Sequence, residues 1–314
     1  MNRGHVYRHR VRDEEHGTTV LALYVARFTH SDEATWRQHV ADGRVELNGR
    51  VAEPAWIVRA GDELVFHRAP WVEPDAPREF AVVHEDEHVL AVDKPAGLQV
   101  LPAGPFTDAT LWTLVRESAP DRAEAAPIHR LGRGTSGIVL FGKTFLARAA
   151  LSQQFRDFHP RKTYLAITDA PRAERFELPH AALHAIGSVP HGPIRIWVAR
   201  EGGKASKTRL RIVGRDRAGR LLVAAQPITG RADQIRIHLA ACGVPIAGDP
   251  LFGVGGDVKS DVTPGRGGYL LHATALAFTH PASGASVKLR CPPRWSEFAD
   301  FARQANDRSL GCAP

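Results

Sequence analysis

Residues 128–144, IHRLGRGTSGIVLFGKT, contain two patterns that could do chemistry on a nucleotide. Residues 132–137 spell G-x-G-x-x-G, a dinucleotide fingerprint, and residues 137–144 spell G-x-x-x-x-G-K-T, a phosphate-binding loop. The fingerprint needs a strand before its glycines, but the apolar, β-branched residues 138–141 predict a strand after them. The phosphate loop needs a loop at the same four positions, which large apolar side chains would leave exposed. Both matches are therefore interpreted as accidental, with a tight turn leading into a buried strand.

Five longer blocks follow one another along the chain and carry polar and aromatic residues suited to an enzyme site. They read HEDEHVLAVDKPAGLQV (residues 84–100), HRLGRGTSGIVLFGKT (129–144), RKTYLAI (161–167), GGKASKT (202–208) and TGRADQIRIHLAACGVPIAGDPLFG (229–253). In order and spacing they resemble the motifs of the RluA-type RNA pseudouridine synthases, including H-R-L-D-x-x-T-S-G, K-x-Y-x-A, G-K-x-A-x-T and T-G-R-x-H-Q-I-R-x-H-L. The resemblance runs from about residue 80 to residue 295.

This resemblance implies an isomerase that converts uridine to pseudouridine in structured RNA, such as rRNA or tRNA. Enzymes of this family break the bond between uracil and ribose, turn the base and rejoin it through a ring carbon, without a cofactor. Their aspartate acts on the sugar as nucleophile or base, an arginine pairs with it, and a tyrosine stacks on the base. Unstacking the uridine costs on the order of a few kcal/mol, part of which an aromatic face recovers.

The resemblance assigns roles to three positions of this chain. Tyr164 matches the stacking tyrosine, Arg231 matches the arginine, and Gly132 stands where the family has its catalytic aspartate. A glycine can be neither nucleophile nor base, so catalysis would need a carboxylate from another segment. From the residues alone, Tyr164 could also be an ordinary half-buried strand residue, and Arg231 a phosphate contact.

Asp233 stands where the family motif has a histidine, and two interpretations of it remain open. As a relocated carboxylate, Asp233 would enter the space left at Gly132 and use Arg231 as its partner. As an ordinary acid at the start of a helix over residues 232–243, it would interact with the helix dipole, worth about 0.3–1 kcal/mol. Without a carboxylate in that space, the chain would be a non-catalytic RNA-binding protein on the same fold.

Basic residues surround the motif blocks and predict an RNA-binding groove. The chain has 41 Lys and Arg residues against 34 Asp and Glu, a net charge of +7 and a pI near 9.7. This excess favours a polyanionic partner, with nucleic acid ahead of an acidic membrane. The residues expected to bind RNA or to shape its pocket are His129, Arg130, Leu131, Arg133, Lys143, Lys162, Lys204, Lys207 and Arg236.

Composition narrows the remaining classes of function. Three widely spaced cysteines, with no C-x-x-C pair and no H-E-x-x-H motif, argue against a disulfide framework and against a metal site. The N-terminus lacks the apolar segment of a signal peptide, and no apolar run reaches membrane-spanning length. We therefore expect a cytoplasmic monomer that uses neither a metal nor a nucleotide cofactor and has no membrane partner.

Many short, alternating strands with few helices between them predict an α+β fold with a mixed, mostly antiparallel central sheet and flanking helices. Residues 1–16 are expected to form a polar arm, and residues 17–69 a small α/β domain that resembles the alpha-L RNA-binding motif. Residues 70–79 are rich in proline and predict a linker. Residues 80–304 would form the catalytic domain with the pseudouridine synthase fold, and residues 305–314 a tail.

Overall fold

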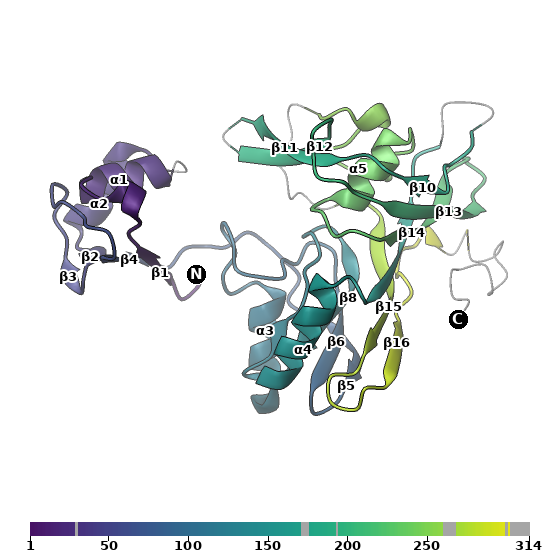
Figure 1. The fold of residues 1–314 in the computed structure, drawn as a ribbon, viewed down its shortest axis with the longest axis horizontal. Helices are drawn as coiled ribbons and strands as arrows, with labels where there is room; N and C mark the ends of the chain where they lie inside the picture. The colour runs from purple at the N-terminus through teal and green to yellow at the C-terminus, as the bar shows by residue number, and fades with distance from the viewer. Residues whose placement is uncertain (29–30, 171–175, 193, 260–267, 299–300, 302–314) are drawn as a thin grey trace. The chain divides into compact units, whose positions relative to one another are not determined.

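The computed structural model describes residues 1–314 except 29–30, 171–175, 193, 260–267, 299–300 and 302–314. The predicted tail, residues 305–314, lies outside the described residues. The chain forms two compact units, Met1–Pro74 and Asp75–Pro314, which are drawn in Figure 1. The boundary between the units falls inside the segment that the sequence predicts as a linker.

The first unit packs two helices on a four-stranded antiparallel sheet. Its elements are β1 (His5–Arg10), α1 (Val20–Arg27), α2 (Glu33–Ala41), β2 (Val45–Leu47), β3 (Arg50–Val51) and β4 (Glu63–Arg68), and the strand order is β1-β4-β2-β3. The Asn48-Gly49 turn joins β2 to β3 with both residues at positive φ, as a tight hairpin requires. Trp36 of α2 is buried against Tyr24 and Phe66.

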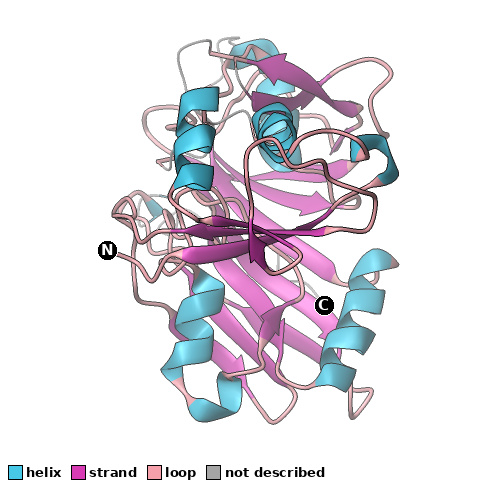
Figure 2. Cartoon of the chain, turned by 90° about the vertical axis from the view of Figure 1, so that its left-hand side faces the viewer, coloured by secondary structure: helices cyan, strands magenta, loops and turns pink. Residues whose placement is uncertain are grey.

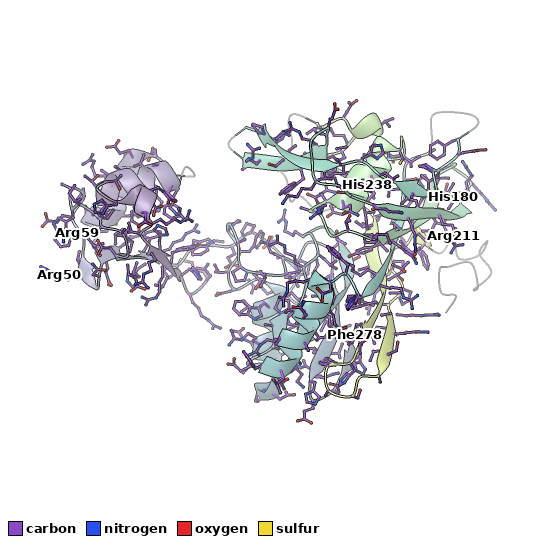
Figure 3. The ribbon with its side chains drawn as sticks, in the orientation of Figure 1. Arg50, Arg59, His180, Arg211, His238 and Phe278 are labelled. Carbon is purple, nitrogen blue, oxygen red and sulfur yellow. The ribbon has the colours of Figure 1, made fainter. Side chains whose placement is uncertain are left out.

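The predicted polar arm is not an arm, because residues 5–10 form β1 and pair with the whole length of β4. Polar residues were compatible with a strand here, since β1 is an edge strand with its side chains mostly exposed or half-buried. Arg50 and Arg59 are exposed on this unit (Figure 3).

The second unit is built on a ten-stranded mixed sheet, in agreement with the predicted α+β class. The strand order is β10-β13-β14-β9-β15-β8-β6-β5, with β16 beside β15 and β7 beside β8. Among the strand pairs of the described residues, only β15–β8 is parallel. The strands are β5 (Ala81–Glu85), β6 (Val89–Lys94), β7 (Ala126–Pro127), β8 (Ser136–Gly142), β9 (Arg161–Ile167), β10 (Ala181–Ala182), β13 (Thr208–Arg215), β14 (Leu221–Pro227), β15 (Leu271–Thr279) and β16 (Ser286–Arg290). A separate hairpin consists of β11 (Ile186–His191) and β12 (Ile194–Ala199).

Helices cover both faces of this sheet, and Figure 2 shows the strands between them. The helices are α3 (Leu111–Ser118), α4 (Phe145–Arg156) and α5 (Gln234–Ala241). Leu111 of α3 packs with Val139, while Leu151 of α4 packs with Leu140, the next residue along β8. Because neighbouring strand residues point to opposite faces, α3 and α4 lie on opposite sides of the sheet. No helix within the described residues is both long and apolar enough to cross a bilayer.

The residues of the accidental phosphate-loop match lie in β8. Residues 138–141 are buried in that strand and pair with β6, so their backbone groups are not arranged as an anion-binding loop. Gly137 has φ +107°, and a Cβ atom there would lie 2.4 Å from the carbonyl oxygen of Ala273. This glycine therefore permits the close parallel approach of β8 to β15.

Candidate active site

A groove of about 940 Å³ in the second unit gathers the residues assigned by sequence. Its walls come from the loop before β8, from β9, from the C-terminal part of α4 and from residues 227–236. Gly132, Tyr164, Arg231 and Asp233 all line this groove. Of the residues expected to bind RNA or shape the pocket, the groove is also lined by His129, Arg130, Leu131, Arg133, Lys162 and Arg236.

Gly132 is exposed in a turn that is closed by the N–H of Thr135 donating to the Gly132 carbonyl at 3.0 Å. A Cβ atom at this glycine would lie 3.1 Å from the hydroxyl oxygen of Tyr269. That hydroxyl is hydrogen-bonded to Thr135 Oγ1 at 3.0 Å. Burial raises the pKa of Tyr269, so the hydroxyl keeps its proton. A buried, neutral phenol thus borders the space where an aspartate side chain would begin.

Arg231 presents an unpaired donor in this groove. Its Nε is buried and has no hydrogen-bond partner among the described residues, and its Nη2 is 3.5 Å from the carbonyl of Ala205. A buried donor without a partner costs about 1–3 kcal/mol. An anion that enters the groove, either a carboxylate or an RNA phosphate, would remove this cost.

Asp233 pairs with Arg236 and not with Arg231, so the predicted partner was wrong. The Nη1 of Arg236 donates to Asp233 Oδ1 at 2.7 Å. Asp233 has a left-handed backbone (φ +52°) and precedes Arg236 by three residues, which places both on one side of the first turn of α5. The Asp233 carboxylate makes no capping hydrogen bond to that helix, and its side chain is 31% exposed. It is therefore accessible from the groove.

Arg236 was expected to contact RNA, and this prediction was wrong because its guanidinium is buried and occupied. Its Nε and Nη2 each donate to one oxygen of Asp249 at 2.8 Å, and the guanidinium lies over the Tyr269 ring at 4.4 Å. Burial acts most strongly and would lower the pKa of Arg236, but the hydrogen bonds to Asp249 together with the charges of Asp233, Tyr269 and Asp249 outweigh it, so the pKa is raised. Arg236 thus anchors the Asp233 carboxylate.

Tyr164 offers an aromatic surface to the groove from β9, where it is half-buried. Burial raises the pKa of Tyr164 to about 12, so its ring stays neutral. Across the groove lining, His129 stacks on Phe155 with ring centroids 4.8 Å apart, and its Nε2 accepts from the N–H of Leu140. Burial lowers the pKa of His129 to about 3, so this histidine adds no positive charge near neutral pH.

The other predicted cations divide into three groups. Arg130 is exposed and Lys162 is half-buried, and both line the groove. Lys143 was expected among the RNA contacts, but its Nζ is held by Glu85 and Asp121 and its side chain is only 8% exposed, so that prediction was wrong. Exposed residues outside the lining are Lys204 and Lys207.

Three buried residues that support the site were not predicted from the sequence: Lys94, Asp249 and Tyr269. The Nζ of Lys94 donates to the carbonyls of Pro95, Leu98 and Arg133, which ties the residue after Gly132 to the turn that follows β6. Burial lowers the pKa of Lys94 to about 7. Lys94 and Asp249 lie inside the motif blocks 84–100 and 229–253, so the motifs could have indicated them as site residues. No motif includes Tyr269, so nothing in the sequence indicated its role.

Comparison with known proteins identifies the family of this chain. The family described as RNA pseudouridylate synthase matches residues 88–241. A protein of Synechocystis, called an uncharacterized RNA pseudouridine synthase, is 38% identical over 279 residues, which cover 87% of this chain and 93% of that protein. The ribosomal large subunit pseudouridine synthase D of Pseudomonas aeruginosa is 32% identical, with 87% of each chain covered. The dual-specificity RNA pseudouridine synthase RluA of Yersinia pestis is 33% identical over 67% of this chain and 97% of that protein.

Solved structures show the same fold. The human RNA pseudouridylate synthase domain containing 1 protein superposes with a TM-score of 0.56 at 24% identity, covering 73% of this chain and 89% of that chain. From these relatives and this fold, we conclude that the chain belongs to the RluA family of RNA pseudouridine synthases.

Proposed function

We propose that the protein converts uridine to pseudouridine in structured RNA, either rRNA or tRNA. The observation that carries this proposal is the convergence of Tyr164, Arg231 and the Gly132 turn in one groove that also presents basic side chains. The groove can hold a uridine taken out of its stack, because Tyr164 offers a stacking face and the cations bind the phosphates beside it.

Asp233 is the carboxylate that acts on the ribose in this proposal. It is an acidic side chain in the groove lining, and the ion pair with Arg236 holds it in place. The backbone of Asp233 is left-handed, a conformation that costs a residue other than glycine on the order of 1–3 kcal/mol. Such strained residues are concentrated at active sites, which supports a functional role for this side chain. The Nε of Arg231, which has no partner among the described residues, then donates a hydrogen bond to an RNA phosphate or to the negative charge that develops during the reaction.

A non-catalytic RNA-binding protein is the alternative, and one observation favours it. Gly132 supplies no carboxylate, and the Tyr269 hydroxyl borders the space where one would stand. A groove without a group that attacks the sugar would still stack a base and bind phosphates.

The test compares pseudouridine formation by the purified wild-type chain, Asp233→Asn and Gly132→Asp. The RNA is total RNA from cells that lack the protein, with each modified position mapped chemically. We expect the wild type to modify a defined uridine and Asp233→Asn to lose activity by orders of magnitude while still binding that RNA. Asp157→Asn, which changes an exposed acid at the end of α4, is the matched control and should retain activity.

Other outcomes separate the alternatives. A wild type that modifies nothing, with a site gained in Gly132→Asp, supports the binding protein. An active wild type whose Asp233→Asn variant keeps full activity rejects Asp233 and leaves the isomerase function standing. The mapped position also identifies the RNA as rRNA or tRNA.

We further propose that the first unit binds the same RNA and that the protein acts as a cytoplasmic monomer without a nucleotide cofactor. Its resemblance to the alpha-L motif and its exposed Arg50 and Arg59 support RNA binding by this unit. Arg50→Glu combined with Arg59→Glu should weaken RNA binding by the full chain without lowering the rate on saturating RNA. Light scattering of the active protein should give the mass of one chain, and added nucleotide should not change the rate.

A further inference from the structure

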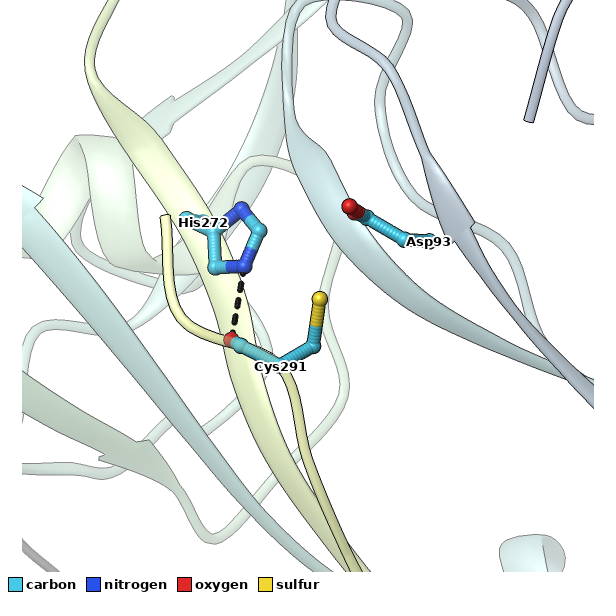
Figure 4. Close-up of side chains that lie close together, drawn as sticks. All are labelled: Asp93, His272 and Cys291. Carbon is cyan, nitrogen blue, oxygen red and sulfur yellow. Dashed lines mark hydrogen bonds between the residues drawn. The ribbon is translucent and has the colours of Figure 1, made fainter. Parts of the chain in front are cut away.

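A second cluster of reactive side chains lies away from the groove. Asp93 comes from the end of β6, His272 from β15 and Cys291 from the residue after β16. One potential ligand atom from each of them lies within 4.8 Å of the other two (Figure 4). Asp93 is far from His272 and Cys291 in the sequence, so the fold brings the carboxylate to the imidazole and the thiol.

The cluster lies on the opposite face of the sheet from Tyr164. His272 pairs with Ser136 on β8 and with Leu165 on β9, while the next residue, Ala273, pairs with Tyr164. Since neighbouring residues of a strand alternate between faces, His272 and Tyr164 point to opposite sides. A ligand at the cluster would therefore not occupy the RNA groove, and the inference does not rest on the proposed function.

His272 and Cys291 are buried, Asp93 is half-buried, and polar groups already contact the cluster. His272 is 2% exposed, Cys291 is 7% exposed, and the side chain of Asp93 is 11% exposed. The Nε2 of His272 donates to the carbonyl oxygen of Cys291 at 2.9 Å, as Figure 4 shows. This bond leaves the lone pair on Nδ1, which accepts from the hydroxyl of Ser136 at 2.8 Å.

This hydrogen-bond pattern is the one that metal-binding histidines show in proteins. A ligating imidazole almost always donates its other N–H to a carbonyl or carboxylate, which fixes the ring and its tautomer. Rotation of the Ser136 hydroxyl would free Nδ1 without breaking the bond from Nε2 to Cys291. Thiolate, imidazole and carboxylate together are the donors that zinc prefers.

Space for a further ligand is present beside the cluster. A cavity of about 550 Å³ is lined by Asp93, Ser136, His272 and Arg294, among others. Arg294 is the competing cation, because its Nε lies 3.4 Å from Asp93 Oδ2, but its side chain is 77% exposed and can leave. Ligand atoms in a tetrahedral zinc site stand roughly 3.5 Å apart, given bond lengths of about 2.0–2.3 Å. The cluster would therefore need to contract by roughly an ångström on binding.

We propose that Asp93, His272 and Cys291 bind one divalent transition-metal ion of the zinc class, with the remaining coordination position open to the cavity. Binding releases the proton of the Cys291 thiol to solvent and breaks no covalent bond other than that S–H. The ion joins the segment after β16 to β6 and β15, and so stabilises the folded second unit.

The test is a titration of the untagged, chelator-treated full chain with Zn²⁺, using a competing indicator dye, and with Co²⁺, using absorption. We expect one equivalent of metal and a thiolate-to-cobalt charge-transfer band. Cys291→Ser should remove the band and weaken Zn²⁺ binding by at least about tenfold, since even outer-shell changes cost about 10–100-fold. Cys242→Ser and Cys312→Ser are the thiol controls and should bind as the wild type does.

Arg294→Ala provides a second variant that predicts the opposite effect. Removing the competing guanidinium from Asp93 should tighten Zn²⁺ binding, and the change removes little packing because the Arg294 side chain is exposed. A wild type that takes up no Zn²⁺ overturns the proposal, and so does equal binding by the wild type and Cys291→Ser. Unchanged or weaker binding by Arg294→Ala would remove Asp93 from the ligand set and overturn the three-residue site.

Discussion

The hydroxyl oxygen of Tyr269 lies 3.1 Å from the place that a Cβ atom would take at Gly132. Gly132 does not have the positive φ that disfavours other residues, so the restriction on a side chain at this position is steric and comes from Tyr269. The position of the Tyr269 hydroxyl therefore favours glycine over larger residues at position 132.

A double-mutant cycle measures this pairing. Gly132→Ala should lower the free energy of unfolding by about 1 kcal/mol, because its Cβ is overpacked against the phenol. In a Tyr269→Phe background the same change should cost less, with a coupling of about 0.5 kcal/mol or more. Both quantities come from urea unfolding of the four proteins. Additive effects would show that Tyr269 does not restrict residue 132.

The buried pair of Arg236 and Asp249 should be essential for stability. Asp249→Asn removes the charge that balances a 7%-exposed guanidinium, and breaking such a pair costs about 3–5 kcal/mol. Chemical denaturation measures this loss. Glu124→Gln, which breaks the exposed contact with Arg116, is the control and should cost less than about 1 kcal/mol. Similar losses in the two variants would contradict the role given to Asp249.

His129 should make the protein less stable as the pH falls from about 6.5 to about 3. The unfolded chain binds a proton at this histidine near pH 6.5, whereas burial holds the folded pKa to about 3. Between these values the unfolded state carries more protons, so the free energy of unfolding rises with pH, by at most about 1.4 kcal/mol per pH unit for one group. Urea unfolding at a series of pH values should show a shallower slope for His129→Gln than for the wild type. Identical slopes would mean that His129 titrates normally in the folded protein.

The cations that line the groove should set the salt dependence of RNA binding. Arg156 is exposed in the lining, so Arg156→Gln should reduce the slope of log affinity against log salt by about 0.7–0.9 if it meets one phosphate. Filter binding at several salt concentrations gives the slope. Arg215→Gln changes an exposed arginine outside the lining and should leave the slope unchanged. An affinity that does not depend on salt would argue against the groove as the RNA site.

Local patterns predicted much of the fold because they depend on neighbouring residues. The apolar run at 138–141 formed the expected buried strand, and residues 232–243 contain α5. The α+β class and the mostly antiparallel sheet were also predicted correctly. Residues 5–10 were missed as a strand because an edge strand with exposed side chains has no apolar alternation to reveal it.

The sequence by itself determined the family and the residues that meet in the groove, because the ordered motifs record both. Only the tertiary structure decided which charges pair. Arg231 and Arg236 are both candidate cations in the sequence, but the turn of α5 and the buried Asp249 place Arg236 beside Asp233. The Nε of Arg231 has no partner in the part of the chain that the structure describes. The contact between Tyr269 and Gly132, and the meeting of Asp93, His272 and Cys291, likewise join segments distant in the chain. Such contacts depend on strand order and register, which local residue patterns do not encode.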